Sequence, residues 1–342
     1  MFSLSKPILS PVRPTLPPVR CGSRELRERI KTVQTTQKIT EAMKLISAAR
    51  VRRAQEAVVS GRPFSSNLAA MLNDITQRLQ NDDVSTPLTL ARPVRTVALV
   101  VVTADRGLCG GFNKSVIRKA LVRIEELEKL NLGCVVISVG KKGNSFFTHS
   151  INKKHPFVKV DSFIEIGGFP TAKEAQVIAD DVFSLFVSEE VDKVELVYVK
   201  FVSLVRFEPV IQNLLPLGEV CDVKDEIFRL SSKEGKLAVE RDVVKLKKEG
   251  EMCFPLMEFE QDPVMILDAM LPLYLNSQVL RGLQESMASE LAARMVAMSN
   301  ATDNAVDLSK RLSVEYNRER QAKITGELLE IVAGAEALAE ND

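Results

Sequence analysis

A long C-terminal stretch without proline constrains the fold of this chain more than any other feature. From about Asn276 to Leu338 the sequence contains no proline and only three scattered glycines, which a long helix tolerates. A continuous helix of this length measures about 95 Å at a rise of about 1.5 Å per residue. Because that is too long for the interior of a compact domain, we expect the helix to project.

Apolar residues in this stretch recur at every seventh position, which favours a left-handed coiled coil. One column contains Leu280, Met287, Ala301 and Leu308, and the next contains Leu291, Met298, Ala305 and Leu312. The polar residues Gln284, Arg294, Glu315 and Glu319 interrupt these columns, and Ile324, Leu328, Ile331, Ala335 and Leu338 restart the repeat in a shifted phase. An ordinary long core helix is the alternative interpretation.

A second long helix is predicted from Arg24 to Gly61, with Ser23 as its cap and with Gly61 and Pro63 as its stop. One apolar face contains Leu26, Ile30 and Val33, another contains Ile39, Met43 and Ile46, and the polar run 34–37 breaks the seam. Between Ser23 and Arg62 there are ten Lys or Arg against four Glu. Two readings of this basic excess stay open: a solvated face, or a surface for an acidic partner.

The segment from about Val94 to Pro216 has α/β composition, with short β-branched runs between helical stretches. Strands are predicted at 97–102, 134–139 and 194–201, and helices at 114–130 and 171–188. Continuous rather than alternating apolar strands indicate a parallel sheet that is covered on both faces. A domain of about 120 residues has a radius of gyration near 14 Å. Neither long helix fits inside it, so we expect the helices to pair with each other or with something else.

Composition excludes several classes of protein. The chain has 342 residues, of which 45% are hydrophobic and 27% charged, and a net charge of +1. The longest aliphatic run is six residues from Val97, far below the roughly 20 needed to cross a bilayer. Near-neutral charge without zinc-ligand spacing gives no case for nucleic-acid binding.

The N-terminal segment 1–22 is predicted to be a leader. Its first twenty residues contain no acid, three basic residues, three Ser and five Pro, so they cannot build a core. An acid-free, basic, Ser-containing start suggests an organelle transit segment. A disordered tail of a cytosolic protein is the alternative.

Two glycine-rich loops could be mistaken for nucleotide sites. The loop Asp105–Asn113 follows a strand and opens a helix, where a phosphate could bind free amides, but neither it nor Gly140–Gly143 has nucleotide-binding spacing. We therefore expect no cofactor. His149 and His155 share one predicted loop, and no metal site or catalytic carboxylate pair is recognisable. Cys109, at a helix start, could have a lowered thiol pKa, which makes it a candidate reactive thiol but not a catalytic one.

Several segments together resemble the gamma subunit of F-type ATP synthase, over about Ser23 to Ala339. They are Thr36–Leu45, Asp105–Gly111, Ala292–Met295, Ala301–Ala305 and the terminal pattern of Ile324, Thr325, Glu327, Glu330, Gly334 and Ala335. The chloroplast form is the most similar, because of Asn276–Leu280 and an extra segment from Gly218 to Cys253. The resemblance implies a non-catalytic rotor subunit, peripheral on the stromal side of the thylakoid membrane.

The resemblance also implies a fold, partners and contacts. The terminal helices would form an antiparallel coiled coil (23–62 and 256–342), and 63–217 would be a Rossmann-like α/β domain. Partners would be the alpha and beta subunits of the catalytic hexamer, the epsilon subunit and the membrane c-ring. Met43, Lys44, Arg294, Arg320, Gln321 and Thr325 would contact catalytic subunits, Ile324, Leu328, Ile331 and Leu338 would form the bearing tip, and 202–207 would face the ring. A coiled-coil oligomerisation arm without a motor role is the alternative function.

One departure from the chloroplast form concerns cysteine. That form carries two cysteines separated by five residues in the extra segment, where a thioredoxin-controlled disulfide holds the enzyme idle. Here no second Cys follows Cys221 until Cys253, so we expect redox control to be weakened or lost, with a Cys221–Cys253 bridge as the alternative. The rest of the segment 218–255 is predicted to be a β-hairpin around 233–236, with Leu237 and Val239 alternating after the turn. Cys21, Cys109 and Cys134 are predicted to be reduced thiols, with Cys134 in the core.

Overall fold

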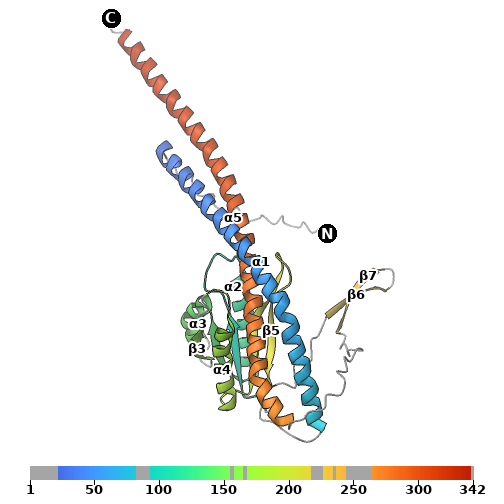
Figure 1. The fold of residues 1–342 in the computed structure, drawn as a ribbon. Helices are drawn as coiled ribbons and strands as arrows, with labels where there is room; N and C mark the ends of the chain where they lie inside the picture. Colours follow the sequence, from blue (N-terminus) through green and yellow to red (C-terminus); the bar gives the residue numbers. More distant parts are fainter. Residues whose placement is uncertain are drawn as a thin grey trace, which may run out of the picture. The chain divides into compact units, whose positions relative to one another are not determined.

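The chain separates into two compact units that share two long helices. The computed structural model describes residues 22–81, 93–154, 158–164, 168–216, 226–233, 236–243 and 263–339. One unit, the body, covers Ala42–Ser299, and the other, the terminal unit, combines Met1–Glu41 with Asn300–Asp342. Helix α1 (Ser23–Asn81) and helix α5 (Pro263–Ala339) each belong partly to both (Figure 1).

Both long helices extend further than predicted. Helix α1 does not stop at Gly61 but continues to Asn81 with Pro63 inside it, and α5 begins at Pro263 rather than near Asn276, with Pro272 inside it. A proline inside a helix removes one backbone hydrogen bond. Both prolines are exposed, so water can hydrate the carbonyl groups that they leave free. Buried residues on either side, such as Val58 and Leu68 in α1, keep the helix packed.

The buried seam of α1 follows a heptad spacing that includes many polar residues. Its positions from Leu26 to Ile75 alternate steps of three and four residues and are all buried or half-buried: 26, 30, 33, 37, 40, 44, 47, 51, 54, 58, 61, 65, 68, 72 and 75. Thr40 and Ser47 thus continue the seam through the region where the apolar pattern fails. The predicted second apolar face lies outside this buried seam, with Ile39 and Ile46 55% and 56% exposed.

Within each unit, α1 and α5 run antiparallel. In the body, Arg62 bonds to Glu285 and Ser65 donates to the Ser277 carbonyl. Residues further along α1 therefore contact residues that come earlier in α5. In the terminal unit, the hydroxyls of Thr40 and Thr302 are 2.8 Å apart.

The body contains a five-stranded sheet of order β3-β2-β1-β4-β5. Its strands are β1 (Thr96–Val102), β2 (Gly133–Val139), β3 (Val158–Ile164), β4 (Lys193–Phe201) and β5 (Phe207–Leu215). The predicted strands β1, β2 and β4 are parallel, as expected, and so is β3, which was not predicted, whereas β5 pairs antiparallel with β4. The fold class is therefore confirmed as α/β with a sheet that is mainly parallel.

Helices cover both faces of the sheet. On one face Ala98, Val100 and Val102 of β1 pack with α1, α4 (Ala172–Val187) and α5. On the other face Val97, Leu99 and Val101 pack with α2 (Phe112–Lys129) and α3 (Lys141–Lys154). This arrangement explains why β1 reads as a continuous apolar run. Among the described residues, no helix is apolar enough over a sufficient length to cross a membrane.

A separate two-stranded hairpin lies in the extra segment. Strands β6 (Glu226–Lys233) and β7 (Lys236–Val243) pair antiparallel, with Lys233 opposite Lys236. This is the pairing that the alternation after residue 236 predicts. Cys221 and Cys253 lie outside the described residues.

Candidate functional sites: an exposed helix end and buried ionic joints

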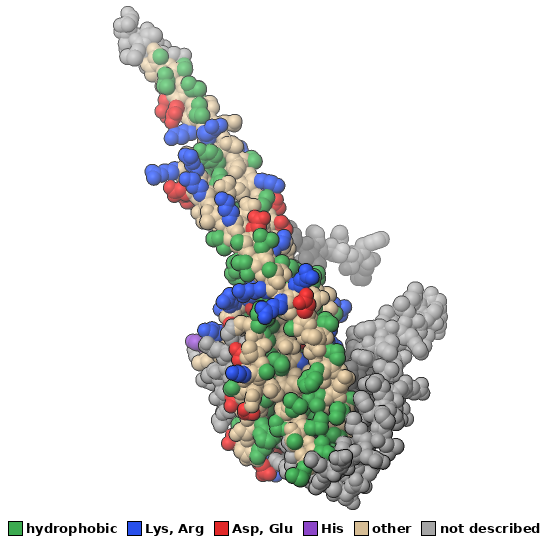
Figure 2. All heavy atoms as spheres, in the orientation of Figure 1, with side chains coloured by type: hydrophobic (Ala, Val, Ile, Leu, Met, Phe, Trp, Pro, Cys, Tyr) green, Lys and Arg blue, Asp and Glu red, His purple; other side chains and the backbone are tan. Residues whose placement is uncertain are grey.

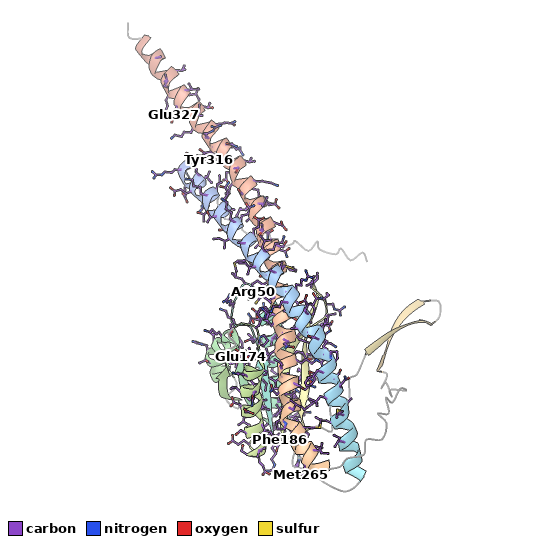
Figure 3. All side chains as sticks on the ribbon, viewed as in Figure 1. Arg50, Glu174, Phe186, Met265, Tyr316 and Glu327 are labelled. Atoms are coloured by element: carbon purple, nitrogen blue, oxygen red, sulfur yellow. The ribbon has the colours of Figure 1, made fainter. Side chains whose placement is uncertain are left out.

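The C-terminal part of α5 exposes several apolar side chains. Between Asn317 and Ala335 every residue except Gly326 is exposed. The exposed apolar residues are Ile324, Leu328, Leu329, Ile331 and Val332, at 48–68%. Figure 3 labels Glu327 within this stretch and Tyr316 just before it. An isolated amphipathic or apolar helix is marginal in water, so this end has the composition of a surface that another protein covers.

The residues predicted to contact catalytic subunits fall into two groups. Met43 and Lys44 are half-buried in the body, whereas Arg320, Gln321 and Thr325 are exposed in the terminal unit. Predicted tip residues Ile324, Leu328 and Ile331 are exposed, and the side chain of Leu338 lies outside the described residues.

Basic side chains are exposed along α1 in the terminal unit. Arg27, Lys31 and Lys38 point to solvent, and Figure 2 shows Lys and Arg side chains along these helices. The ion pairs of Arg24 with Glu28 and of Arg29 with Glu25 are exposed and lie within one helix, at 3.6 Å each. Such pairs contribute little to stability, so the basic excess remains available to a partner of opposite charge.

Arg294 is buried and bonds to residues of its own chain. It is only 7% exposed, forms an ion pair with Glu290 one turn earlier, and donates to the carbonyl groups of Arg106 and Gly107 at 3.4 Å. Its guanidinium therefore holds the Asp105–Asn113 loop against α5 and is not presented at an exposed surface. The sequence could not show this, because a single Arg on a helix carries no sign of its partner.

Backbone amides of the Gly140–Gly143 loop are hydrogen-bonded to residues that follow β1. The Asp105 carboxylate accepts from the Lys141 amide, and the Thr103 hydroxyl accepts from the Gly143 amide, both at 2.9 Å. The Lys142 amide donates to the Ala104 carbonyl at 3.2 Å. The first amides of α3 are thus occupied within the chain, which leaves them unable to bind a phosphate. In the described part of the chain, no three His, Cys, Asp or Glu side chains are grouped to hold a metal ion.

Cys109 is not an activated thiol in this structure. It is 2% exposed, and its sulfur accepts from Asn113 Nδ2 at 3.2 Å. Burial, with a smaller contribution from Glu290, raises the thiol pKa, against the partial opposition of Arg294. The prediction of a lowered pKa is therefore wrong, since desolvation outweighs the helix start. Cys134 is a core residue, as predicted, and burial raises its pKa to about 12.

We expect Cys134 to resist alkylation in the native chain. At pH 8 a thiol with a pKa near 12 is ionised to about one part in ten thousand, and only the thiolate attacks. Treatment of the folded chain with iodoacetamide, followed by peptide mass spectrometry, should leave Cys134 unmodified, whereas treatment in denaturant should modify it fully. Rapid modification of Cys134 in the native chain would contradict its placement in the core.

A buried carboxylate connects both long helices to the sheet. Glu285 in α5 has no exposed side-chain surface, and it accepts from Arg62 Nε of α1 at 3.0 Å and from the Phe201 amide of β4 at 3.2 Å. Arg281 Nε adds a third bond at 3.2 Å, and Arg62 Nη2 donates to the Phe201 carbonyl at 2.6 Å. We call Glu285, Arg62, Arg281 and the Phe201 backbone the helix joint.

A second buried carboxylate fastens α2 to the sheet. Arg123 of α2 donates from Nε and Nη2 to the two oxygens of Glu195 in β4, at 2.8 and 2.7 Å. Glu195 is 1% exposed, and its hydrogen bond to Arg123 is the main reason why the Arg123 pKa is raised. A single acid inside the apolar run Val194–Val199 was the signal that could have identified this pair.

Two further surface features lie on the body. A pocket of about 80 Å³ between the Asp105 loop and α5 is lined by Arg50, Arg106 and Glu290, among others (Figure 3 labels Arg50). The β4–β5 turn, which includes the residues predicted to face the ring, exposes Val202, Leu204 and Val205 at 41–78%.

The fold and these sites define an α/β protein that carries an antiparallel pair of long terminal helices, uses its buried charges as internal joints and exposes an apolar helix end. A family model described as ATP synthase matches residues 22–338. The chain belongs to the ATP synthase gamma-chain family.

Relatives and solved structures agree with this assignment. The chain is 61% identical to the chloroplastic ATP synthase gamma chain of Spinacia oleracea, covering 95% of this chain and 90% of the relative. It is 65% identical to the chloroplastic gamma chain 2 of Arabidopsis thaliana, covering 94% and 85%. A Euglena gracilis mitochondrial ATP synthase structure shares the fold, with a TM-score of 0.57 and 19% identity, covering 92% of this chain and 94% of that one.

Proposed function

We propose that this chain is the central rotor shaft of a chloroplast F-type ATP synthase, which couples rotation of a proton-driven ring to conformational cycling of the catalytic subunits. The exposed apolar end of α5 carries the proposal, because a helix with this surface requires a surrounding partner. A Tetrahymena thermophila structure described as a central stalk and c-ring, with a TM-score of 0.52, has a similar fold.

The chain does no chemistry in this proposal. An asymmetric shaft presents a different face to each surrounding catalytic subunit, and each face favours a different conformation of that subunit. Contacts can shift such an equilibrium only by their difference in free energy between the conformations. Rotation then changes which subunit binds tightly and which releases product.

The contacts follow from the exposed surfaces. Alpha and beta subunits would meet Met43, Lys44, Arg320, Gln321 and Thr325, and the bearing would enclose Ile324, Leu328, Ile331 and Leu338. The basic face of α1 would meet acidic loops of the hexamer. The body would bind the epsilon subunit and the c-ring, and the complex would lie on the stromal side of the thylakoid membrane.

Dithiol control is expected to be weakened or absent. Cys221 has no partner at the spacing of the chloroplast pair, and the next cysteine is Cys253. A rotor without that disulfide has no covalent device with which to respond to thioredoxin.

Reconstitution tests the function and its redox response together. Purified alpha and beta subunits combined with this chain should hydrolyse ATP, and a dithiol reductant should leave the rate unchanged. The Cys221→Ser variant is the matched control, because it removes the candidate cysteine without touching the helices. Stimulation by reductant that is lost in Cys221→Ser would establish a Cys221 bridge, and failure to assemble with the hexamer would overturn the rotor assignment in favour of an oligomerisation arm.

A further inference from the structure

The apolar packing around the helix joint is close but not directional. Residues Val51, Ala54, Val58, Phe201, Ala288, Leu291 and Ala292 form one buried cluster there. A Cβ on Gly61 would lie 2.9 Å from Gln284 Oε1, and one on Gly282 would lie 2.8 Å from Leu196 Cδ2. The helices and strand β4 thus approach closely. Apolar contacts oppose separation of these elements, but because they are non-directional they discriminate weakly between angular positions.

The hydrogen bonds of Glu285 are directional. Bonds to charged groups weaken steeply when their geometry is lost. A turn of α5 about its axis would carry Glu285 away from Arg62 and from the Phe201 amide, which lie on different elements. The carboxylate would then stand in the interior with fewer partners, a costly state for a desolvated charge. The joint therefore selects one angular position of the helices on the sheet.

A neighbouring hydrogen bond also depends on the angular position of α5 on the sheet. Ser286, the next residue, accepts a hydrogen bond from the Val199 amide of β4 at 3.2 Å. Strand β1 pairs with β4 only as far as Val197. Beyond that point, side chains of α5 accept the hydrogen bonds of the Val199 and Phe201 amides. Helix α5 is in this way joined to the sheet by hydrogen bonds from strand amides to its side chains as well as by packing.

We propose that Glu285 is a positioning residue that fixes α1 and α5 in angle on the sheet and so sets the torsional stiffness with which the body is coupled to the helices. The inference rests on the proposed rotor function, because stiffness matters only to a chain that transmits torque. Both helices continue beyond the body, to Ser23 and to Ala339. Torque that passes between them and the sheet is carried in part by the helix joint.

Stiffness and stability are separable at this joint. Buried ion pairs are weak contributors to net stability, and apolar side chains of similar volume often replace them without loss. Their better supported role is to specify one arrangement among several. A variant with an apolar joint should therefore be stable but torsionally soft.

The test uses complexes of alpha, beta and this chain, with the hexamer fixed to a surface and a rod attached to the body through Lys173→Cys on α4, which is exposed. The width of the angular fluctuations during a pause reports the torsional stiffness. Glu285→Gln should increase the angular variance about two-fold, since it removes the charge that holds both arginines. The triple variant Arg62→Met, Arg281→Met, Glu285→Leu should regain thermal stability but keep the broad variance.

Glu195→Gln is the matched control. It also neutralises a buried carboxylate held by an arginine, but that pair joins α2 to β4 and touches neither long helix. It should lower stability and leave the angular variance at the parental value. If the parental complex rotates and Glu285→Gln has parental variance, the inference is overturned while the rotor function stands. Equal broadening in Glu195→Gln would also overturn it, and a parental complex that does not rotate would overturn the rotor function itself.

Discussion

Replacing Gly140 by alanine is expected to destabilise the body by about 2–6 kcal/mol. Gly140 has φ +98°, a conformation that costs a residue with a side chain about 1–3 kcal/mol. The added Cβ would also lie 2.3 Å from the Thr103 carbonyl oxygen, and overpacking of this kind costs about 1–3 kcal/mol. Thr103 cannot easily give way, because its amide and its hydroxyl both donate to the Val139 carbonyl, at 2.8 and 2.9 Å.

Denaturant unfolding of the purified chain, followed by tyrosine fluorescence, measures this loss, since Tyr198 and Tyr274 are buried in the body. Gly111→Ala is the control: it lies in the other glycine loop, has no positive φ and has no atom within 4 Å of the added Cβ. It should change the free energy of unfolding by about 0.5 kcal/mol or less. An unchanged midpoint for Gly140→Ala would show that the two glycine loops are not packed as described.

The central strands were predictable because their environment leaves a clear pattern. Strands β1, β2 and β4 are covered on both faces, so they read as mostly apolar runs, which Ser138 interrupts in β2 and Glu195 in β4. Strand β5 gave no such pattern, because seven of its nine residues are only half-buried at the sheet edge. Helix α3 was also missed, since Phe147 is its main core residue and most of its other residues are polar.

The limits of the long helices were harder to predict than their existence. Proline is a strong local signal for a helix end, yet Pro63 and Pro272 lie inside helices whose buried faces continue past them. Tertiary packing outweighs the local penalty there. The seam of α1 was hidden for a related reason, because Thr40, Ser47 and Ser65 fill heptad positions that are identified by burial rather than by hydrophobicity.

The exposed surfaces and the buried joints differ in what the sequence reveals. The apolar end of α5 was predictable, since Ile324, Leu328 and Ile331 repeat in a helix with no visible partner. Glu285 gave no signal, because a glutamate on a long helix is ordinarily solvated. Its partners Arg62 and Phe201 come from remote parts of the chain, and only the folded body brings the three together. A buried joint of this kind is therefore visible in the folded chain and not in the sequence pattern.

Replacing Arg123 by methionine is expected to destabilise the body by about 3 kcal/mol, because it leaves the Glu195 carboxylate buried without its main partner. Lys193 Nζ, 3.8 Å from Glu195 Oε1, remains but makes no bond of comparable geometry. Glu195 is 1% exposed and lies in β4, which is flanked by β1 and β5, so its carboxylate cannot reach solvent without local rearrangement of the body.

The double variant Arg123→Met, Glu195→Leu distinguishes a lost attraction from an orphaned charge. If the loss arises from the unpaired carboxylate, removing that carboxylate should restore most of the stability, because apolar replacement of both partners is often neutral. If the ion pair itself supplied the stability, the double variant should be as unstable as Arg123→Met. Unfolding measurements on Arg123→Met, Glu195→Leu, the double variant and the parent give the coupling energy of the pair. Recovery in the double variant would mean that this pair, like the helix joint, sets the position of a helix on the sheet more than it sets the stability of the body.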